Sequence, residues 1–397
     1  MRGRRLSLEN RSDWLGELEL VGADPGSWSR LSAKSSIMAL KLFDLSSPMA
    51  NILKQSMLSA GADALVTREA VTGRAPSSDA LVVGTEKAIR RAAESLLGQP
   101  LGLAAVGETI NSLLKRPALP KTMQLPGGTL DFSRRPLVMG VINVTPDSFS
   151  DGGLHLSPAD ALRRAEEMAE AGADLVDLGA ESTRPGSSPV GAREQIDRLL
   201  PVLKGMEGLP EAPLISVDTS LPEVAESALR AGASIINDVT ALSRPELAEI
   251  AAESGAGLVL MHMQGRPSNM QDDPRYRDVL TEVCDYLAGR VEIAKERGVP
   301  VQRIIVDPGI GFGKRLEHNI ALIRRLDELH CLGCRVLLGH SRKSFLGAIS
   351  GVDDPAARDI HTHAVTALVA SDADLLRVHD AAGALEVLKI ARALRGG

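Results

Sequence analysis

Short apolar runs alternate with amphipathic segments over the last two thirds of the chain. Each run is too short for most helices and is bounded by polar or helix-breaking residues, which is typical of a buried strand. The segments between the runs carry helix signals. Ser157 followed by Pro158, for example, offers an N-cap and then proline at the first helical position. The pattern predicts strands at 137–142, 175–178, 214–217, 235–236, 258–261, 304–306, 336–338 and 375–378.

Eight strand–helix units in roughly 265 residues have the size and rhythm of an α/β fold, the (β/α)8 TIM barrel. The rhythm alone leaves a doubly wound sheet open as the alternative. Polar residues favour the barrel, because nearly every apolar run ends in one and a barrel brings all of its strand ends to one mouth. These strand-end residues are Asn143, Glu181, Asp218, Asn237, His262, Asp307, Ser341, Arg377 and His379.

The first third of the chain follows a different plan. Residues 1–35 show no clear period and are expected to form a poorly fixed lead-in. Residues 36–125 predict a small α/β N-terminal domain, with an apolar strand at 37–45 and strands near 64–66 and 81–83. The run Ser46-Ser47-Pro48 predicts a helix N-cap with proline at the first helical position, and this helix ends at Gly61. Prolines and glycines at 117–120 and 126–128 predict a linker, which places the barrel domain at 126–397.

Composition and charge narrow the classes of function. Aromatic residues make up only 2% of the chain, which argues against stacking platforms for single-stranded nucleic acid. The net charge of −6 argues against a general polyanion-binding surface, so we expect no nucleic-acid partner. No run approaches the ~18 apolar residues that span a bilayer, and the amino terminus lacks the apolar stretch of a secretory signal. We therefore expect a cytoplasmic protein with no membrane partner.

The sulfur and imidazole groups give weak metal signals. Three cysteines form an odd, sparse set that fits a reducing compartment. Cys331 and Cys334 have C-x-x-C spacing without a second pair, so ordinary buried thiols are favoured over a zinc or redox site. His361 and His363 lie on a predicted helix, where rings two residues apart point to different faces, and this disfavours shared metal ligation.

Amide, hydroxyl, guanidinium and imidazole donors follow several of the predicted strands. Asn143, Thr183 with Arg184, and Arg377 with His379 could converge as a mixture of donors suited to phosphate oxygens. A salt bridge for Arg377 and a core role for His379 are the alternatives. Their shared position at strand ends favours the anion site.

Two carboxylates and one amide form a second group at strand ends. Asp218, Asp307 and Asn237 would satisfy the paired N–H donors of a flat heterocycle, as carboxylates and amides satisfy bases elsewhere. The alternatives are helix capping by Asp218, since Thr219 and Ser220 follow, and a turn role for Asp307, since Pro308 and Gly309 follow.

Two further runs carry candidate chemistry. The glycine-rich run at 307–314 completes neither nucleotide-loop pattern, so its glycines are expected to let backbone pass close to a flat ligand. The run Ser-Arg-Lys-Ser at 341–344 adds two cations and two hydroxyls at a strand-to-helix junction, where a helix N-terminus attracts a carboxylate or phosphate. A solvated basic turn is the alternative for this second run.

Eight stretches occur in order along the chain: GVINVTPDSFSDGG, DLGAESTRPGS, SVDTS, IINDV, LMHMQG, VDPGIGFGK, SRKSFLG and RVHD. Together these stretches resemble the dihydropteroate synthase family of the pterin-binding (β/α)8 barrels. The resemblance covers roughly two thirds of the chain and implies a transferase of folate biosynthesis. Such an enzyme condenses 6-hydroxymethyl-7,8-dihydropterin pyrophosphate with p-aminobenzoate and releases pyrophosphate; we predict a dissociative substitution.

By motif, the resemblance also implies roles for single residues, a Mg2+ cofactor near Asn143 and a homodimer formed through late helices. Phe149, Asp151 and Arg184 would belong to two mobile loops that close over the small-molecule substrates. Catalysis would fall to Asp218, Asp307, Lys343, Arg184 and Asp151. The implied contacts are Asp218, Asn237, Met261, Asp307, Phe312 and Lys343 for pterin, Asn143, Thr183, Arg377 and His379 for pyrophosphate, and Phe149 and Ser344 for p-aminobenzoate.

Three features depart from the family pattern. His340 stands where a smaller or apolar residue is expected, and the run at 359–362 replaces the small residues usual before the final helix. The N-terminal module is absent from the compact form of the family. Two other functions stay open, a methyltetrahydrofolate-dependent methyltransferase and a pterin-binding protein without catalysis. The cations at 341–344 and 377–379 argue against the methyltransferase, which would leave that anion machinery idle.

Overall fold

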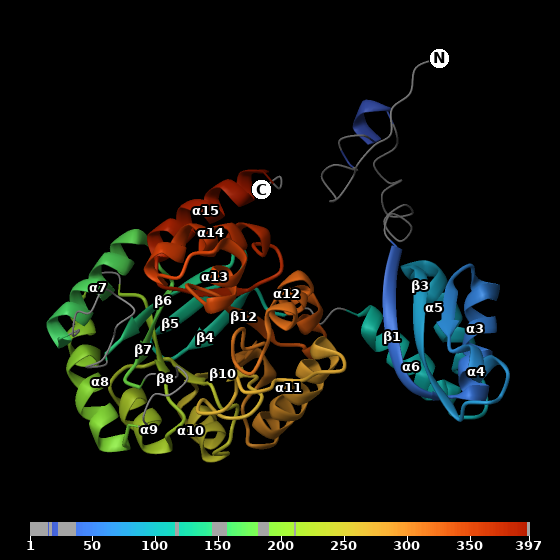
Figure 1. Cartoon of the computed structure of the whole chain (residues 1–397), viewed down its shortest axis with the longest axis horizontal. Helices are drawn as coiled ribbons and strands as arrows, with labels where there is room; N and C mark the ends of the chain where they lie inside the picture. Colours follow the sequence, from blue (N-terminus) through green and yellow to red (C-terminus); the bar gives the residue numbers. More distant parts are fainter. Residues whose placement is uncertain are drawn as a thin grey trace. The chain divides into compact units, whose positions relative to one another are not determined.

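The computed structural model describes residues 15, 18–22, 37–115, 119–144, 157–181, 190–209 and 212–394. The chain divides into two compact units, Met1–Arg116 and Pro117–Gly397 (Figure 1). We call them the N-terminal unit and the barrel unit. Within the described ranges, no helix has the length and apolar character needed to cross a membrane.

The N-terminal unit is a small α/β domain, as the sequence predicts. Its three strands form an antiparallel sheet in the order β1-β3-β2, and helices α3 and α5 pack on the sheet. Gly61 ends α3 with φ +84°, and the Thr85 hydroxyl caps α5 by accepting a hydrogen bond from the Ala88 N–H at 3.3 Å. The elements are β1 (Ile37–Ser46), α3 (Ser47–Ala60), β2 (Asp63–Val66), α4 (Arg68–Val71), β3 (Ser77–Thr85), α5 (Glu86–Leu96) and α6 (Leu103–Leu114).

The barrel unit is a closed parallel barrel, which excludes the doubly wound sheet. Its eight strands follow the order β10-β11-β12-β13-β6-β7-β8-β9, so each strand pairs with its neighbours in sequence and β13 closes onto β6. All eight predicted strands are present. They are β6 (Leu137–Asn143), β7 (Leu175–Gly179), β8 (Leu214–Asp218), β9 (Ile235–Asp238), β10 (Gly257–Met261), β11 (Ile304–Asp307), β12 (Arg335–Gly339) and β13 (Leu375–Val378).

Helices form a ring around the strands (Figure 1). Helix α7 begins and ends at signals visible in the sequence: Ser157 caps it by accepting from the Asp160 N–H at 3.2 Å, and Gly172 ends it with φ +89°. The ring is made of α7 (Pro158–Ala171), α8 (Ala192–Met206), α9 (Pro222–Arg230), α10 (Glu246–Ser254), α11 (Val279–Glu296), α12 (Leu316–Arg324), α13 (Ser344–Ser350), α14 (Asp359–Leu368) and α15 (Ala381–Leu394), with short 3-10 turns η3 (Val301–Arg303), η4 (Leu326–Leu332) and η5 (Ala356–Arg358).

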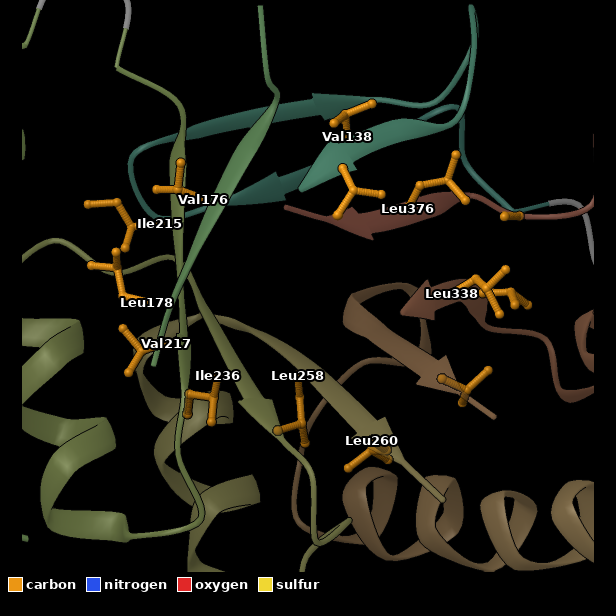
Figure 2. Packing of buried hydrophobic residues seen from close by; sticks show 14 of the residues in the cluster. Val138, Val176, Leu178, Ile215, Val217, Ile236, Leu258, Leu260, Leu338 and Leu376 are labelled. Atoms are coloured by element: carbon orange, nitrogen blue, oxygen red, sulfur yellow. The ribbon is translucent and has the colours of Figure 1, made fainter. Parts of the chain in front are cut away.

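The strands have an outward and an inward face, because side chains alternate along a strand. Outward residues such as Val176, Leu178 and Val217 pack with helix residues in the main core (Figure 2). Inward residues at the strand starts, including Leu175 and Ile235, form a separate apolar layer inside the barrel. The polar residues named above follow this inward layer toward the carboxyl ends.

A hairpin packs onto the inward layer. Strand β4 (Thr122–Leu125) pairs antiparallel with β5 (Gly128–Asp131), and Met123 and Leu130 are buried in the same cluster as Leu137 and Leu175. These two strands therefore belong to the barrel unit, ahead of the boundary that the sequence predicts at 125/126. The prolines and glycines interpreted as a linker flank and turn this hairpin instead.

Candidate active site

The carboxyl ends of the barrel strands form a mouth, and the strand register brings the predicted residues to one level. Asn143 pairs in register with Gly179, Gly179 with Asp218, and Asp218 with Asn237. On the other side of the barrel, Met261 pairs with Asp307. The predicted pterin residues on β8 to β11 therefore share one end of the barrel with Asn143.

The remaining predicted residues follow β12 and β13 or lie outside the described residues. Lys343 and Ser344 stand at the start of α13, and His379 follows β13. Arg377 is an inward residue of β13 and pairs in register with Gly339. The predicted residues that fall outside the described ranges are Phe149, Asp151, Thr183 and Arg184.

A buried carboxylate, Asp177 of β7, is the hub of the mouth. It accepts hydrogen bonds from Ser216 Oγ at 2.6 Å and Asn237 Nδ2 at 3.0 Å, and its second oxygen also takes Arg377 Nε at 2.6 Å. Arg377 Nη2 reaches Asp218 Oδ2 at 3.3 Å. The guanidinium thus lies between two carboxylates that would otherwise repel each other.

The environment of Asp218 favours its neutral form. Burial, followed by repulsion from Asp177, raises the pKa of Asp218 to about 7, although Arg377 acts in the opposite direction. At neutral pH this carboxyl is therefore poised between its two protonation states. Perturbation by burial together with a specific charged partner is typical of functional sites.

Asp307 and Lys343 form a second charged pair in the mouth. Burial raises the pKa of Asp307, while the positive charge of Lys343 and a hydrogen bond from the Gly309 N–H at 2.7 Å act against that rise. Burial lowers the pKa of Lys343 to about 8. Lys343 Nζ lies 4.7 Å from the centre of the Phe312 ring and donates to the Ile310 carbonyl. A cation, a carboxylate and an aromatic face are therefore adjacent.

A buried lysine fastens the loop that carries Phe312 to the end of β10. Lys314 Nζ donates to the Phe312 carbonyl at 3.0 Å and the His262 carbonyl at 3.4 Å, and lies 2.9 Å from His262 Nδ1. Burial and Lys314 together lower the pKa of His262 to about 3, so the ring is neutral and its Nδ1 can accept. We call Lys314, His262 and Phe312 the lysine clamp.

The glycines of the 307–314 run serve this same packing. A Cβ on Gly309, which has φ +68°, would lie within 1.9 Å of the His262 carbonyl oxygen, and one on Gly313 would lie 2.3 Å from the Gln264 carbonyl oxygen. Backbone does pass close at these positions, as expected, but the partner is the neighbouring β10–α11 loop rather than a ligand.

The anion side of the mouth is built around Ser341 and His379. The buried Ser341 hydroxyl accepts from the His379 backbone N–H at 3.1 Å and lies 2.9 Å from its Nδ1. Asn143 Oδ1 faces the same opening, since a Cβ on Gly179 would lie 3.4 Å from it and 3.8 Å from Asp218 Cβ. Imidazole, hydroxyl and amide groups thus lie at the same end of the barrel as Arg377.

The contacts in the structure distinguish between the alternative roles of Asp218, Asp307 and Arg377. Leu221 is the N-cap of α9, so Asp218 does not cap that helix. Asp307 does accept from Gly309 in its turn and faces Lys343 as well, so its two roles coexist. Arg377 makes salt bridges, and they are made within the mouth itself.

Sequence reasoning missed two residues of the site. Asp177 lies inside a predicted apolar strand, and Lys314 ends the glycine-rich run that suggested backbone packing only. The available signal for Asp177 was a single charged residue at an inward position of an otherwise apolar run, because such a residue is buried only when it is paired.

The weak metal signals gain no support. All three cysteines are free thiols; Cys334 is buried as predicted, but Cys331 is exposed, so the prediction of a buried thiol is wrong there. His363 Nε2 lies 3.2 Å from Asp380 Oδ2 across the α14–α15 contact. Among the residues that the structure describes, no group of three or more His, Cys, Asp or Glu side chains is arranged to hold a metal ion by itself.

Comparison with known proteins agrees with this geometry. The model of the pterin binding enzyme family matches residues 139–379, which include all eight strands apart from the first two residues of β6 and extend through the anion side. The chain belongs to the pterin-binding enzyme family.

Relatives within this family are dihydropteroate synthases. The chain is 42% identical over 392 residues to a probable bifunctional folylpolyglutamate synthase/dihydropteroate synthase of Halobacterium salinarum, an alignment that takes in 98% of this chain and 46% of the relative. It is 43% identical to the dihydropteroate synthase of Escherichia coli over 67% of this chain and 94% of that protein. A Xanthomonas albilineans dihydropteroate synthase solved with 4-aminobenzoic acid is 40% identical with a TM-score of 0.64, covering 70% of this chain and 99% of that one.

The chain thus spans less than half of the bifunctional relative and nearly all of the shorter ones. Both of the shorter alignments are slightly shorter than the barrel unit. The long alignment covers nearly the whole chain and so takes in the N-terminal unit. The N-terminal unit therefore lies within the alignment to the probable bifunctional relative.

Proposed function

We propose that the chain is a dihydropteroate synthase, a transferase that joins 6-hydroxymethyl-7,8-dihydropterin pyrophosphate to p-aminobenzoate and releases pyrophosphate. The observation that carries the proposal is the meeting of two complementary groups in one mouth. Acceptors for a pterin, Asp218, Asn237 and Asp307, lie beside donors for pyrophosphate on β6 and β13. Either group alone would fit many ligands.

The pterin side would hold its ligand by paired hydrogen bonds and by shape. The carboxylates of Asp218 and Asp307 accept the N–H donors of the aminopyrimidine edge, and Lys343 donates to its ring acceptors. Met261 and Phe312 line the slot for the flat ring, and the hydrogen bond from Lys314 to the Phe312 carbonyl holds Phe312 in place. Burial makes each of these polar contacts stronger than it would be in water.

Catalysis would be mostly electrostatic and positional. The bond between the pterin methylene and the pyrophosphate oxygen breaks with its electron pair going to oxygen, which leaves a cationic pterin. The lone pair of the p-aminobenzoate nitrogen then forms the new C–N bond, and that nitrogen loses a proton to solvent. Asp218 and Asp307 stabilise the cation, and Arg377 with His379 neutralises the leaving group.

Two subsites of the reaction rest in part on residues outside the described ranges. Ser344 at the start of α13 would receive the p-aminobenzoate carboxylate, with Phe149 beside the ring. Thr183 would add a hydroxyl to the pyrophosphate side, while Asp151 and Arg184 would act from the two loops.

Magnesium fits the donor set on the anion side. Mg2+ keeps several waters and is usually bound by few protein oxygens together with substrate phosphates. The Asn143 amide oxygen at the end of β6 offers such a ligand without a dedicated protein cage. Bound with the substrate, the ion would supply charge neutralisation of the pyrophosphate group.

A homodimer would bury apolar surface on the late helices. Large apolar side chains are exposed on α14 and α15, and one more, Ile349, on α13. Helices α14 and α15 contact each other, so these side chains lie on adjacent helices, where a partner surface could cover them. We place this homodimer in the cytoplasm. The exposed side chains on α14 and α15 are Ile360 at 72%, Leu368 at 70%, Ile390 at 63% and Leu394 at 83%.

The test is incubation of the whole chain with pterin pyrophosphate and labelled p-aminobenzoate, with and without Mg2+. The proposal expects labelled 7,8-dihydropteroate and released pyrophosphate, with less product when Mg2+ is removed. Pterin binding without labelled product would contradict it and would favour a binding protein. Methyl transfer from methyltetrahydrofolate in a parallel assay would favour the methyltransferase instead.

A further inference from the structure

The segment between β12 and α13 makes a left-handed turn at Arg342. Its φ is +58°, a region that residues with a Cβ rarely occupy and that glycine enters freely. A non-glycine residue keeps such a conformation only when its surroundings hold it there, and residues of this kind cluster at functional sites.

Contacts from η5 and α14 bind both backbone polar groups of Arg342 and two nitrogens of its guanidinium. Its guanidinium donates through Nε and Nη2 to the two oxygens of Asp359, both at 2.7 Å. Its backbone N–H donates to Thr362 Oγ1 at 3.1 Å, and its carbonyl accepts from Arg358 Nη1 at 3.0 Å. We call Arg342, Arg358, Asp359 and Thr362 the turn lock. Two guanidinium nitrogens of Arg342 are thus paired with a carboxylate of α14.

The two neighbours of Arg342 serve opposite sides of the mouth. Ser341 contacts the backbone and ring of His379 on the anion side. Lys343 faces Asp307 and the Phe312 ring on the pterin side. The backbone reverses at Arg342, and this reversal allows Ser341 and Lys343, two positions apart, to serve different subsites. We propose that Arg342 is a positioning residue, locked by Asp359, that sets Ser341 and Lys343 in their separate subsites.

Both local departures from the family pattern belong to this arrangement. Asp359 and Thr362 are members of the turn lock, in the run where small residues are usual. His340 is fully buried, and its Nε2 lies 3.0 Å from Thr366 Oγ1 and 3.2 Å from the Thr362 carbonyl oxygen. The unusual histidine therefore packs on the same turn of α14 that carries Thr362, so the two departures are coupled.

The Arg342–Asp359 pair differs from an ordinary surface salt bridge. Exposed ion pairs contribute little stability. The Arg342 and Asp359 side chains, however, are only 13% and 27% exposed, and their two parallel hydrogen bonds fix the geometry of the pair. The backbone N–H and carbonyl of Arg342 are also hydrogen-bonded, and these two contacts fix the backbone dihedral angles of the residue.

The decisive comparison is between glycine and alanine at position 342. Glycine adopts φ near +58° without any lock, whereas alanine does not. Arg342→Gly should keep kcat/KM for pterin pyrophosphate within roughly threefold of the unchanged protein, because glycine preserves the turn. Arg342→Ala should lower it by between about tenfold and a hundredfold, the usual cost of misplacing a contact by about an ångström. Equal losses in the two variants would overturn the inference, because they would mean that the side chain itself is needed.

A second arm tests the lock from α14. Asp359→Asn removes the charged acceptor pair and should lower kcat/KM as Arg342→Ala does. In the Arg342→Gly background, Asp359→Asn should have no further effect, because the turn no longer depends on the lock. An active Asp359→Asn protein, or a further loss in the glycine background, would contradict the inference.

The matched control is Glu328→Gln, which breaks the exposed two-contact pair between Arg325 and Glu328 at 2.5 and 2.9 Å. Its kcat/KM should not change. Thermal midpoints of all variants distinguish a loss of folded protein from a displacement of Ser341 and Lys343 in a protein that is still folded. The inference rests on the proposed synthase activity. Inactivity of the unchanged protein in the same assay would reject that activity, while the order of the variants tests the turn lock.

Discussion

The two ends of the barrel interior are built from the same strands and have opposite chemistry. On β7, Leu175 and Asp177 both point inward, two residues apart, yet Leu175 lies in the apolar layer against the hairpin and Asp177 in the charged mouth. The closed end buries aliphatic side chains that need no partners. The open end buries carboxylates and cations that must satisfy one another. This contrast indicates that one end stabilises the fold and the other holds charges ready for a ligand.

The largest effect is expected from a substitution at the open end of the barrel. Asp218→Asn keeps the shape of the side chain and removes the charge that would stabilise a cationic pterin. We expect turnover to fall by at least about a hundredfold, comparable with removal of a preorganised electrostatic group elsewhere. Steady-state kinetics with labelled p-aminobenzoate provide the measurement. Turnover close to that of the unchanged protein would remove Asp218 from the site.

The matched change at the closed end should act on stability instead. Leu175→Ala removes a fully buried side chain from the apolar layer and should lower the free energy of unfolding by roughly 2–5 kcal/mol. The folded fraction should turn over substrate nearly normally. Denaturant titration and kinetics on the same sample are needed, and a selective loss of turnover with unchanged stability would contradict the division of roles.

A smaller effect is expected from the lysine clamp, which supports the mouth without facing it. Lys314→Met keeps most of the volume and removes the hydrogen bonds to Phe312 and His262. The pterin slot should loosen, so that KM for pterin pyrophosphate rises by about tenfold while kcat changes little, the sign of lost uniform binding. Lys295→Met on the exposed face of α11 is the control. A fall in kcat with unchanged KM would mean that Lys314 takes part in the chemical step.

The mildest test uses pH. The reaction needs Asp218 ionised and Lys343 protonated, so kcat/KM should rise through about pH 7 and fall through about pH 8, following the raised pKa of Asp218 and the lowered pKa of Lys343. Lys343→Arg keeps a positive charge at all these values. It should move the alkaline fall to higher pH even if the maximum is lower. An unchanged alkaline limb in this variant would assign that limb to another group.

Much of the architecture could be predicted because its signals are local. Each barrel strand is an apolar run between helix signals, and the glycine and serine caps of α3 and α7 are visible within a few residues. The sequence predicts a linker where the hairpin lies, because proline and glycine interrupt both periodicities in a tight turn just as they do in an extended linker. Its contact with the barrel interior comes from Met123 and Leu130, whose partners are distant in sequence.

The site was harder to predict, since its defining contacts join distant segments. Asp177 meets Ser216, Asn237 and Arg377, which lie 39, 60 and 200 residues away in the chain. Strand ends indicated which residues gather at the mouth, but no local pattern shows which of them pair. For the same reason His340 and the run at 359–362 looked like separate oddities, although they lie against each other.

The most direct test of the contrast is the stability of Asp218→Asn as a function of pH. The folded-state pKa of Asp218 is raised, so folding favours its protonated form, and its ionisation costs stability as pH rises from about 4 through about 7. The asparagine variant should therefore gain in thermal midpoint over the unchanged protein at pH 8, and this gain should shrink toward zero near pH 4, while turnover is lost at every pH. A variant that is less stable at pH 8 would mean that the ionised carboxylate holds the fold together, and would contradict the account.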